Sequence, residues 1–289
     1  MRQSAPSGLV VVDKPAGTTS HGVVAQVRRL VGTRKVGHAG TLDPMATGVL
    51  VIGVERATRL LGHLMLTEKA YDATIRLGSA TTTDDAEGEV VSTAAVDGVT
   101  EEQVRDALLA FVGDIQQVPT AVSAIKVDGK RAYARVRDGE QVELKARPVI
   151  VHEIVVHEVA LPDVRVSVRC SSGTYIRAIA RDLGAALGVG GHLAALRRTA
   201  VGPFDLSSAR TLEELADDVA VLPIADAARA SFPAIDLTED QAADVRVGRA
   251  LDLAIPGTGE HALFAPDGEF LALYAGAGGR AKPVAVFVG

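Results

Sequence analysis

The sequence predicts an α+β protein made of one large mixed domain followed by a small β-rich unit. Apolar residues recur at helical spacing over residues 20–31 and 176–187. Apolar and polar residues alternate strictly over 69–77 and 164–170, which indicates half-buried strands. After Phe232-Pro233 the chain contains mainly short β-type segments, so we place a domain boundary there.

The composition indicates an aliphatic core. Of the 289 residues, 47% are hydrophobic, only 3% are aromatic and none is tryptophan. The one cysteine, Cys170, excludes an intramolecular disulfide and a multi-cysteine metal site, and is most simply a small core residue. No apolar run is long enough to span a bilayer, and residues 1–7 lack an apolar signal segment. We therefore expect a soluble cytoplasmic protein.

Charge is distributed unevenly along the chain. The net charge is −6, which by itself argues against a nucleic-acid partner. However, residues 1–62, 120–150 and 165–210 carry net charges of +5, +3 and +5, whereas 72–119 and 211–289 each carry −8. Basic segments that converge on one face bind phosphates whatever the global sum. The alternative is that charge simply varies along any chain.

Local patterns predict the elements of the first third of the chain. A strand, a helix with Ser20 as its cap, a second strand, a helical segment and a third strand are predicted over 8–12, 20–31, 49–54, 56–66 and 69–77. A polar, turn-rich stretch follows at 78–98.

Three threonines further on, Thr100, Thr211 and Thr238, begin capping-box patterns with Glu or Gln three residues later. The other predicted elements are neighbouring strands over 149–161 and 164–170, a helix over 176–187 with Ser172 or Thr174 as its cap, a hairpin over 262–274 and a last strand over 284–288. A β-rich unit of about sixty residues is marginal alone, so we expect it to pack against the larger domain.

A short irregular loop around Asp43 is the stretch on which the functional interpretation depends. Gly37 and Gly40 permit a positive φ or a close backbone approach, and Pro44 moves Asp43 towards an extended conformation. Such a loop holds one carboxylate rigidly at the edge of a sheet. For an isolated Asp-Pro, the simpler interpretation is an Asx turn that bonds local backbone.

The string Gly-His-Ala-Gly-Thr-Leu-Asp-Pro-Met-Ala-Thr-Gly-Val-Leu at 37–50 resembles the catalytic motif of bacterial tRNA pseudouridine synthases of the TruB type. These enzymes modify uridine 55 in the T loop. Gly-Thr-Tyr-Ile-Arg at 173–177 and the segment 192–199 match further family motifs. The region 117–135 also matches, but departs from the family pattern at Thr120 and Val122.

The resemblance implies a particular fold and domain organisation. Residues 1–230 are expected to form a pseudouridine synthase fold, with a central mixed, largely antiparallel sheet flanked by helices. An RNA-binding thumb insertion is expected at about 117–147. Residues 231–289 are expected to form a small PUA-like RNA-binding domain, although their acidic character argues against tight independent RNA binding.

The resemblance also implies roles for single residues. Asp43 is the expected catalytic carboxylate, Arg177 its partner, and Tyr71 the tyrosine under the target base, with its hydroxyl a candidate to help remove the C5 proton. The expected substrate-binding residues are His38, Asp85, Tyr175, Leu196 and Lys126. For Tyr71 the simpler interpretation is a core aromatic, and for His38 a loop histidine that bonds backbone.

The residues themselves support the pairing of Arg177, because an arginine in the first turn of a helix gains nothing from the helix dipole and so indicates a dedicated partner. An ionised Asp43 can attack ribose C1′ or uracil C6, or abstract a ribose proton, and the sequence does not separate these routes. We expect no metal and no cofactor, because the sequence holds no metal cluster pattern and no nucleotide-binding fingerprint. We expect a monomer that acts on the T stem-loop of tRNA, with no membrane and no obligate protein partner.

Three other interpretations stay open. The chain can be a non-catalytic RNA-binding module or tRNA folding chaperone that does not need Asp43. It can be an aspartate-dependent glycoside hydrolase, whose second carboxylate would come from Asp13, Asp72 or Asp85. It can also be a related synthase that acts on another RNA.

Overall fold

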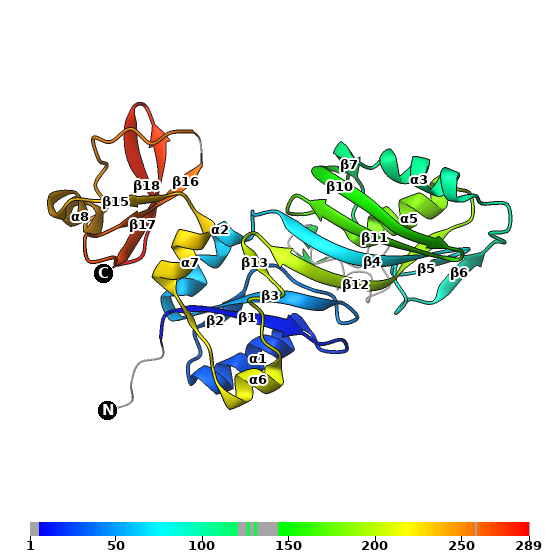
Figure 1. The fold of residues 1–289 in the computed structure, drawn as a ribbon, viewed down its shortest axis with the longest axis horizontal. Helices are drawn as coiled ribbons and strands as arrows, with labels where there is room; N and C mark the ends of the chain where they lie inside the picture. Colours follow the sequence, from blue (N-terminus) through cyan, green and yellow to red (C-terminus); the bar gives the residue numbers. More distant parts are fainter. Residues whose placement is uncertain (1–5, 121–125, 128–129, 132–143, 258, 289) are drawn as a thin grey trace.

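A large twisted sheet runs through the main part of the molecule (Figure 1). The structure is a computed structural model that describes residues 6–120, 126–127, 130–131, 144–257 and 259–288. Within these residues the sheet contains ten strands in the order β14-β1-β3-β12-β4-β11-β10-β7, with β2 paired to β3 and β13 to β12. The pairing of β3 with β12 is parallel, and the other pairings described in this sheet are antiparallel.

The described strands of the large sheet are β1 (Gly8–Lys14), β2 (Val36–His38), β3 (Thr47–Val54), β4 (Lys69–Leu77), β7 (Gly113–Gln117), β10 (Arg147–Ala160), β11 (Asp163–Cys170), β12 (Gly191–Val201), β13 (Phe204–Asp205) and β14 (Leu222–Pro223). Two small hairpins are formed by β5 (Ser79–Thr81) with β6 (Val90–Thr93) and by β8 (Lys126–Val127) with β9 (Lys130–Arg131). The described helices of this part are α1 (Ser20–Val31), the 3-10 helix η1 (Glu55–Arg59), α2 (Leu61–Leu64), α3 (Glu101–Leu109), α5 (Ile176–Ala186), α6 (Leu212–Asp217) and α7 (Ile224–Ser231).

The sheet consists of two halves that meet at β3 and β12. These two strands are in register over only two residue pairs, Arg197 with Thr47 and Arg198 with Gly48. Figure 1 shows α1 and α6 together on the half that contains β1–β3, and α3 and α5 on the half that contains β4, β10 and β11. The loop that carries Asp43 connects β2 to β3, so it lies at the junction of the two halves.

The core is aliphatic, as the composition predicts. Its largest apolar cluster joins side chains of both halves of the sheet to α1 and α5, for example Val12, Leu50, Ile75, Val166 and Ile179. Full burial of each such side chain stabilises the fold by about 1.5–3 kcal/mol relative to exposure. Cys170 is buried in the same cluster, and burial raises the pKa of its thiol to about 11. The interpretation of Cys170 as a small core residue is therefore confirmed.

A second, four-stranded sheet forms the C-terminal unit (Figure 1). Its described elements are β15 (Ala234–Asp236), α8 (Glu239–Arg246), β16 (Glu260–Phe264), β17 (Phe270–Ala277) and β18 (Arg280–Val286). Phe264, Phe270 and Phe287 share an apolar cluster with Leu60 and Ala227 of the larger part. The expectation that this unit packs against the larger domain is therefore confirmed.

Several predicted boundaries need correction. The cap of α1 is Thr19, whose hydroxyl accepts from Gly22 N, and not Ser20. Helix α5 follows Tyr175 without a side-chain cap, so neither Ser172 nor Thr174 caps it. The helical segment predicted over 56–66 is the short pair η1 and α2. The three predicted capping boxes, at Thr100, Thr211 and Thr238, are all present.

Among the described residues, the structure contains no helix with the length and apolar character needed to cross a membrane.

Candidate active site

The loop that carries Asp43 is fixed by buried polar side chains from β1 and α1. The Lys14 ammonium, fully buried, donates to the carbonyl of Pro44 over 3.2 Å and also to the carbonyls of Pro15 and Thr18. The buried hydroxyl of Ser20 accepts from Leu42 N over 2.9 Å and donates to Leu42 O over 3.0 Å. These bonds hold the backbone on both sides of Asp43.

Glycine is required where this loop enters β3. Gly48 has a φ of +98°, and a Cβ added there would lie 2.2 Å from the carbonyl oxygen of Arg198. The absent side chain lets β3 approach β12 at the point where the two halves of the sheet join.

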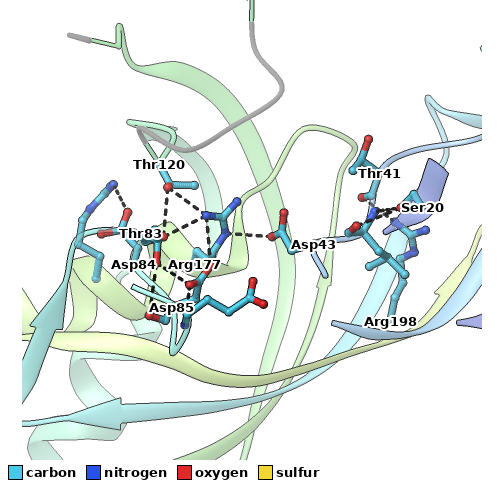
Figure 2. A network of polar contacts seen from close by, with 12 residues as sticks. Ser20, Thr41, Asp43, Thr83, Asp84, Asp85, Thr120, Arg177 and Arg198 are labelled. Carbon is cyan, nitrogen blue, oxygen red and sulfur yellow. Dashed lines mark hydrogen bonds and ion pairs between the residues drawn. The ribbon is translucent and has the colours of Figure 1, made fainter. Parts of the chain in front are cut away.

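Arg177, from the first turn of α5, reaches across to the Asp43 carboxylate (Figure 2). Its Nε lies 3.0 Å from Asp43 Oδ2, and its Nη1 lies 3.3 Å from Asp85 Oδ2. The side chains of Arg177 and Asp85 are buried, whereas that of Asp43 keeps 33% of its surface exposed. One buried guanidinium therefore joins two carboxylates, of which Asp43 is the one open to solvent.

Burial raises the pKa of Asp43 above its ordinary value, and the neighbouring carboxylate of Asp85 acts in the same direction. The cations Arg177 and Lys14 oppose this shift. Burial also lowers the pKa of Lys14, to about 8. Burial and Asp85 thus disfavour the charged form of Asp43, and the two neighbouring cations favour it.

Tyr71 lies on β4 and is buried, with 7% of its surface exposed. Burial raises the pKa of its phenol, and the guanidinium of Arg198 acts against this rise. Arg198 itself is almost completely buried and donates to three backbone carbonyls, those of Val49 over 2.7 Å, Gly40 over 3.3 Å and Thr41 over 3.5 Å. Arg198 thus connects the surroundings of Tyr71 to the loop that carries Asp43.

The other predicted site residues come from β2, β8, the residue before α5, and β12. His38, on β2, is half-buried and contacts the ring of His21 edge-on at 5.4 Å. Tyr175 is half-buried and precedes α5, and Leu196 is buried on β12. Lys126 lies on β8, and its side chain is outside the described part of the structure.

A cavity of about 630 Å³ opens beside the loops that carry Asp43 and Asp85. Met45, two residues after Asp43, and Glu87, two residues after Asp85, both line it. Leu196 lines it as well, together with polar side chains of β4, β10, β11 and β12, among them Asp72, Ser167 and Arg197. Space for a small group is therefore present next to the loop that carries Asp43.

The structure gives different surroundings to Asp13, Asp72 and Asp85, the three candidates for the second carboxylate of a glycoside hydrolase. Asp13 pairs with Arg197 over 2.7 Å, and Asp72 accepts from Ser167 over 2.6 Å. Only Asp85, of these three, shares the Arg177 guanidinium with Asp43. Asp85 is buried and bound to Arg177, so it is poorly placed to activate a water molecule. Among the described residues, no cluster of His, Cys, Asp and Glu could hold a metal ion.

Sequence reasoning missed Lys14, Ser20 and Arg198 as parts of this site. For Ser20 the sequence predicts a helix cap instead, because the residue stands just before an apolar helical pattern. Arg198 carried a signal, since it lies in the 192–199 segment that matches the family pattern. Lys14 carried none beyond a lysine at the end of a buried strand.

Comparison with known proteins agrees with this geometry. A family model described as TruB family pseudouridylate synthase (N terminal domain) matches residues 28–176. Models described as tRNA pseudouridylate synthase B C-terminal domain and tRNA Pseudouridine synthase II, C terminal, match 177–228 and 232–288.

Relatives named tRNA pseudouridine synthase B are similar over nearly the whole chain. The protein of Arthrobacter sp. (strain FB24) is 60% identical over 97% of this chain and 96% of its own length. That of Thermobifida fusca (strain YX) is 57% identical over 98% of this chain and 99% of its own length.

Solved structures show the same fold. The structure titled "Crystal Structure of a Cbf5-Nop10-Gar1 Complex" contains a chain with a TM-score of 0.77 and 28% identity, over 99% of this chain and 86% of that chain. The structure titled "Structure of H/ACA RNP bound to a substrate RNA containing 2'-deoxyuridine" gives 0.75 and 26%, over 98% and 85%.

Fold and site together define a pseudouridine synthase. Within that class, the chain belongs to the TruB family of pseudouridylate synthases. The predicted α+β fold, with its mixed sheet and its small C-terminal β sheet, and the predicted enzyme class are confirmed.

Proposed function

We propose that this protein converts uridine to pseudouridine at position 55 in the T loop of tRNA, without a metal or an organic cofactor. The observation that carries the proposal is the Asp43 carboxylate, partly exposed on a fixed loop and held by Arg177 at 3.0 Å. Near-full-length relatives that are named tRNA pseudouridine synthase B support tRNA as the substrate.

In this proposal Asp43 performs the demanding step. The reaction breaks the bond from ribose C1′ to uracil N1 and forms one from C1′ to C5. The base loses a proton at C5 and gains one at N1, so the product is an isomer of the substrate. Arg177 binds Oδ2 of Asp43, so we assign Oδ1 as the reacting oxygen, whether it attacks C1′ or C6 or removes a ribose proton.

The remaining site residues bind the nucleotide. A uridine within a folded loop must leave its stack to reach Asp43, and this extrusion costs a few kcal/mol. Leu196, which lines the cavity beside Asp43, packs against the extruded nucleoside, and His38 contacts the nucleotide or fills the vacated space. Tyr175 and Lys126 contact the RNA around it.

In this proposal Tyr71 and Asp85 act at the target base, beside Asp43. Tyr71 supplies an aromatic surface and a hydroxyl for removal of the C5 proton. Because Tyr71 is buried, stacking on a base requires neighbouring side chains to make room. Asp85 lies near the base and binds Nη1 of Arg177, whereas Asp43 binds Nε.

The chain is divided into two units in this proposal. Residues 1–230 form the catalytic domain, with an RNA-binding thumb at about 117–147, most of which lies outside the described residues. Residues 231–289 form a PUA-like domain. The enzyme is a cytoplasmic monomer, and the basic segments 1–62, 120–150 and 165–210 meet the tRNA backbone.

The experiment is a map of modified uridines after the purified protein has acted on unmodified tRNA. Cyanoethylation adds mass to pseudouridine, and mass spectrometry then locates it. We expect one modified site, at position 55, and no free uracil. Modification elsewhere, with position 55 untouched, would refute the substrate assignment. Release of free uracil would favour a hydrolase, and binding without any product would favour an RNA-binding module.

A further inference from the structure

The chain segment that leaves β7 is anchored on the start of α5. Gln117, which is buried, donates from Nε2 to Tyr175 O over 3.1 Å and accepts from Tyr175 N over 2.8 Å. One turn along the helix, Arg181 donates to Val118 O over 2.8 Å. Two side-chain contacts therefore hold residues 117–118 against the turn of α5 that presents Arg177.

Thr120 makes a third contact, and this one reaches Arg177 itself (Figure 2). The residue is fully buried. Its hydroxyl accepts from Arg177 Nη1 over 3.3 Å and donates to Thr83 O over 3.4 Å. The same Nη1 donates to Thr83 O over 3.0 Å. Thr120, Thr83 and Arg177 thus form a closed triangle of polar atoms.

This triangle determines the direction in which the guanidinium points. A guanidinium is planar, so fixing Nη1 leaves Nε little freedom to rotate. Nη1 is fixed by Thr83 O, Thr120 Oγ1 and Asp85 Oδ2, and Nε then faces Asp43 Oδ2 at 3.0 Å. Loss of the Thr120 hydroxyl removes one of these acceptors. It also removes the hydrogen bond that Thr120 donates to Thr83 O.

We propose that Thr120 is a positioning residue, whose buried hydroxyl fixes the Arg177 guanidinium so that its Nε holds Asp43 in the reactive orientation. The inference rests on the proposed function for its effect on turnover. Thr120 is also one of the two positions at which this chain departs from the family pattern. The family pattern therefore does not predict this hydroxyl contact.

The test compares Thr120→Val, which keeps the shape and removes the hydroxyl, with Thr120→Ser, which keeps the hydroxyl. Thr67→Val is the matched control, because Thr67 also donates its hydroxyl to a backbone carbonyl, that of Leu64, but contacts no site residue described here. Single-turnover rates at saturating enzyme and the Kd for tRNA are measured for each, with thermal unfolding as a check of folding.

We expect Thr120→Val to slow the single-turnover rate roughly five- to tenfold, the change that one buried hydrogen bond supports. Its Kd for tRNA should stay within about twofold of the unmodified protein's, because only orientation within the site changes. Thr120→Ser and Thr67→Val should keep full rates. A Thr120→Val rate equal to that of Thr67→Val, or a weaker Kd with an unchanged rate, would overturn the inference.

The pKa of Asp43 provides a readout that does not need turnover. The charged groups that face Asp43 are Arg177, Lys14 and Asp85, and Arg177 is the stronger of the two that lower its pKa. A less well-held Arg177 should therefore leave the pKa of Asp43 higher in Thr120→Val than in Thr67→Val, measured by carboxyl ¹³C NMR. An Asp43 pKa that is the same in Thr120→Val and Thr67→Val would contradict the inference, whether or not the protein acts on tRNA. If the protein without substitutions does not modify tRNA, the proposed function is refuted instead.

Discussion

At the scale of the residue, the central feature is a carboxylate whose charge costs the fold free energy. The pKa of Asp43 is raised by burial, so the folded protein keeps this proton to a higher pH than the unfolded chain does. Ionised Asp43 therefore destabilises the fold above its folded pKa, and the penalty disappears as the pH falls towards the ordinary value for aspartate. Such a cost is tolerated where a reactive group is needed.

The first prediction concerns Asp43→Asn. This variant should unfold at pH 7 at a temperature equal to or higher than that of the unmodified protein, because it removes a partly buried charge. The difference should shrink as the pH is lowered through the folded pKa of Asp43. Thermal unfolding followed by circular dichroism between pH 4 and pH 7 measures it. A clearly lower midpoint at pH 7 would mean that pairing with Arg177 outweighs burial.

The second prediction compares two neighbouring arginines. Arg198→Met leaves the carbonyls of Val49, Gly40 and Thr41 without this donor, so it should destabilise the protein by roughly 2–4 kcal/mol. Arg197→Met breaks a half-exposed pair with Asp13, which is worth about 0–1 kcal/mol, and a 3.3 Å hydrogen bond to the Thr47 hydroxyl, but leaves no buried backbone carbonyl without its donor. Urea unfolding of both variants checks this, and equal losses would contradict the role given to Arg198.

At the scale of the element, the junction of β3 and β12 determines where the active-site loop lies. The two strands meet over two residue pairs, and this contact depends on the missing side chain of Gly48. The same glycine has a positive φ, so geometry and space both exclude a larger residue.

The third prediction is that Gly48→Ala destabilises the protein by about 3 kcal/mol or more, because the new Cβ would overlap the Arg198 backbone and the φ is strained. Gly98→Ala is the control, since a Cβ there meets nothing within 4 Å and its φ is not positive. Its effect should stay within about 0.5 kcal/mol. The comparison uses urea unfolding, and a tolerated Gly48→Ala would show that the strands can separate at no cost.

Elements with local signals could be predicted from the sequence, and their partners could not. The capping box at Thr100 closes within one turn of helix, so its signal lies entirely in four residues. The contact from Arg198 to Gly40 spans 158 positions, and no local pattern carries it. The parallel pairing of β3 with β12 is equally non-local. For the same reason the pairing of Arg177 with Asp43 was implied by resemblance and by an unexplained first-turn arginine, whereas the contact of Thr120 was not foreseen.

At the scale of the whole molecule, the C-terminal unit is joined to the larger part by mixed contacts. The ring of Phe287 lies under the guanidinium of Arg59 at 5.3 Å and against Phe270 at 4.8 Å. Beside it, His63 Nδ1 lies 2.7 Å from a carboxylate oxygen of Glu260. The unit is acidic, yet it is attached through basic side chains that precede β4.

The fourth prediction is that Phe287→Ala destabilises the protein by about 3–5 kcal/mol, since it opens a cavity in the cluster shared by the two parts. It should also speed limited proteolysis of the connection near Phe232, because the C-terminal unit is less firmly attached. Val247→Ala, at a side chain that is 67% exposed, should change neither measurement. Unchanged proteolysis in Phe287→Ala would show that other contacts suffice.

The most direct test of the account is the single-turnover rate of pseudouridine formation by Asp43→Asn, measured beside its affinity for tRNA. The amide keeps the size of the side chain and loses the reactive carboxylate. We predict that Asp43→Asn binds tRNA within about threefold of the unmodified protein and forms product more than about a hundredfold more slowly. A variant that binds tRNA and forms pseudouridine at a comparable rate would contradict the assignment of the chemistry to Asp43.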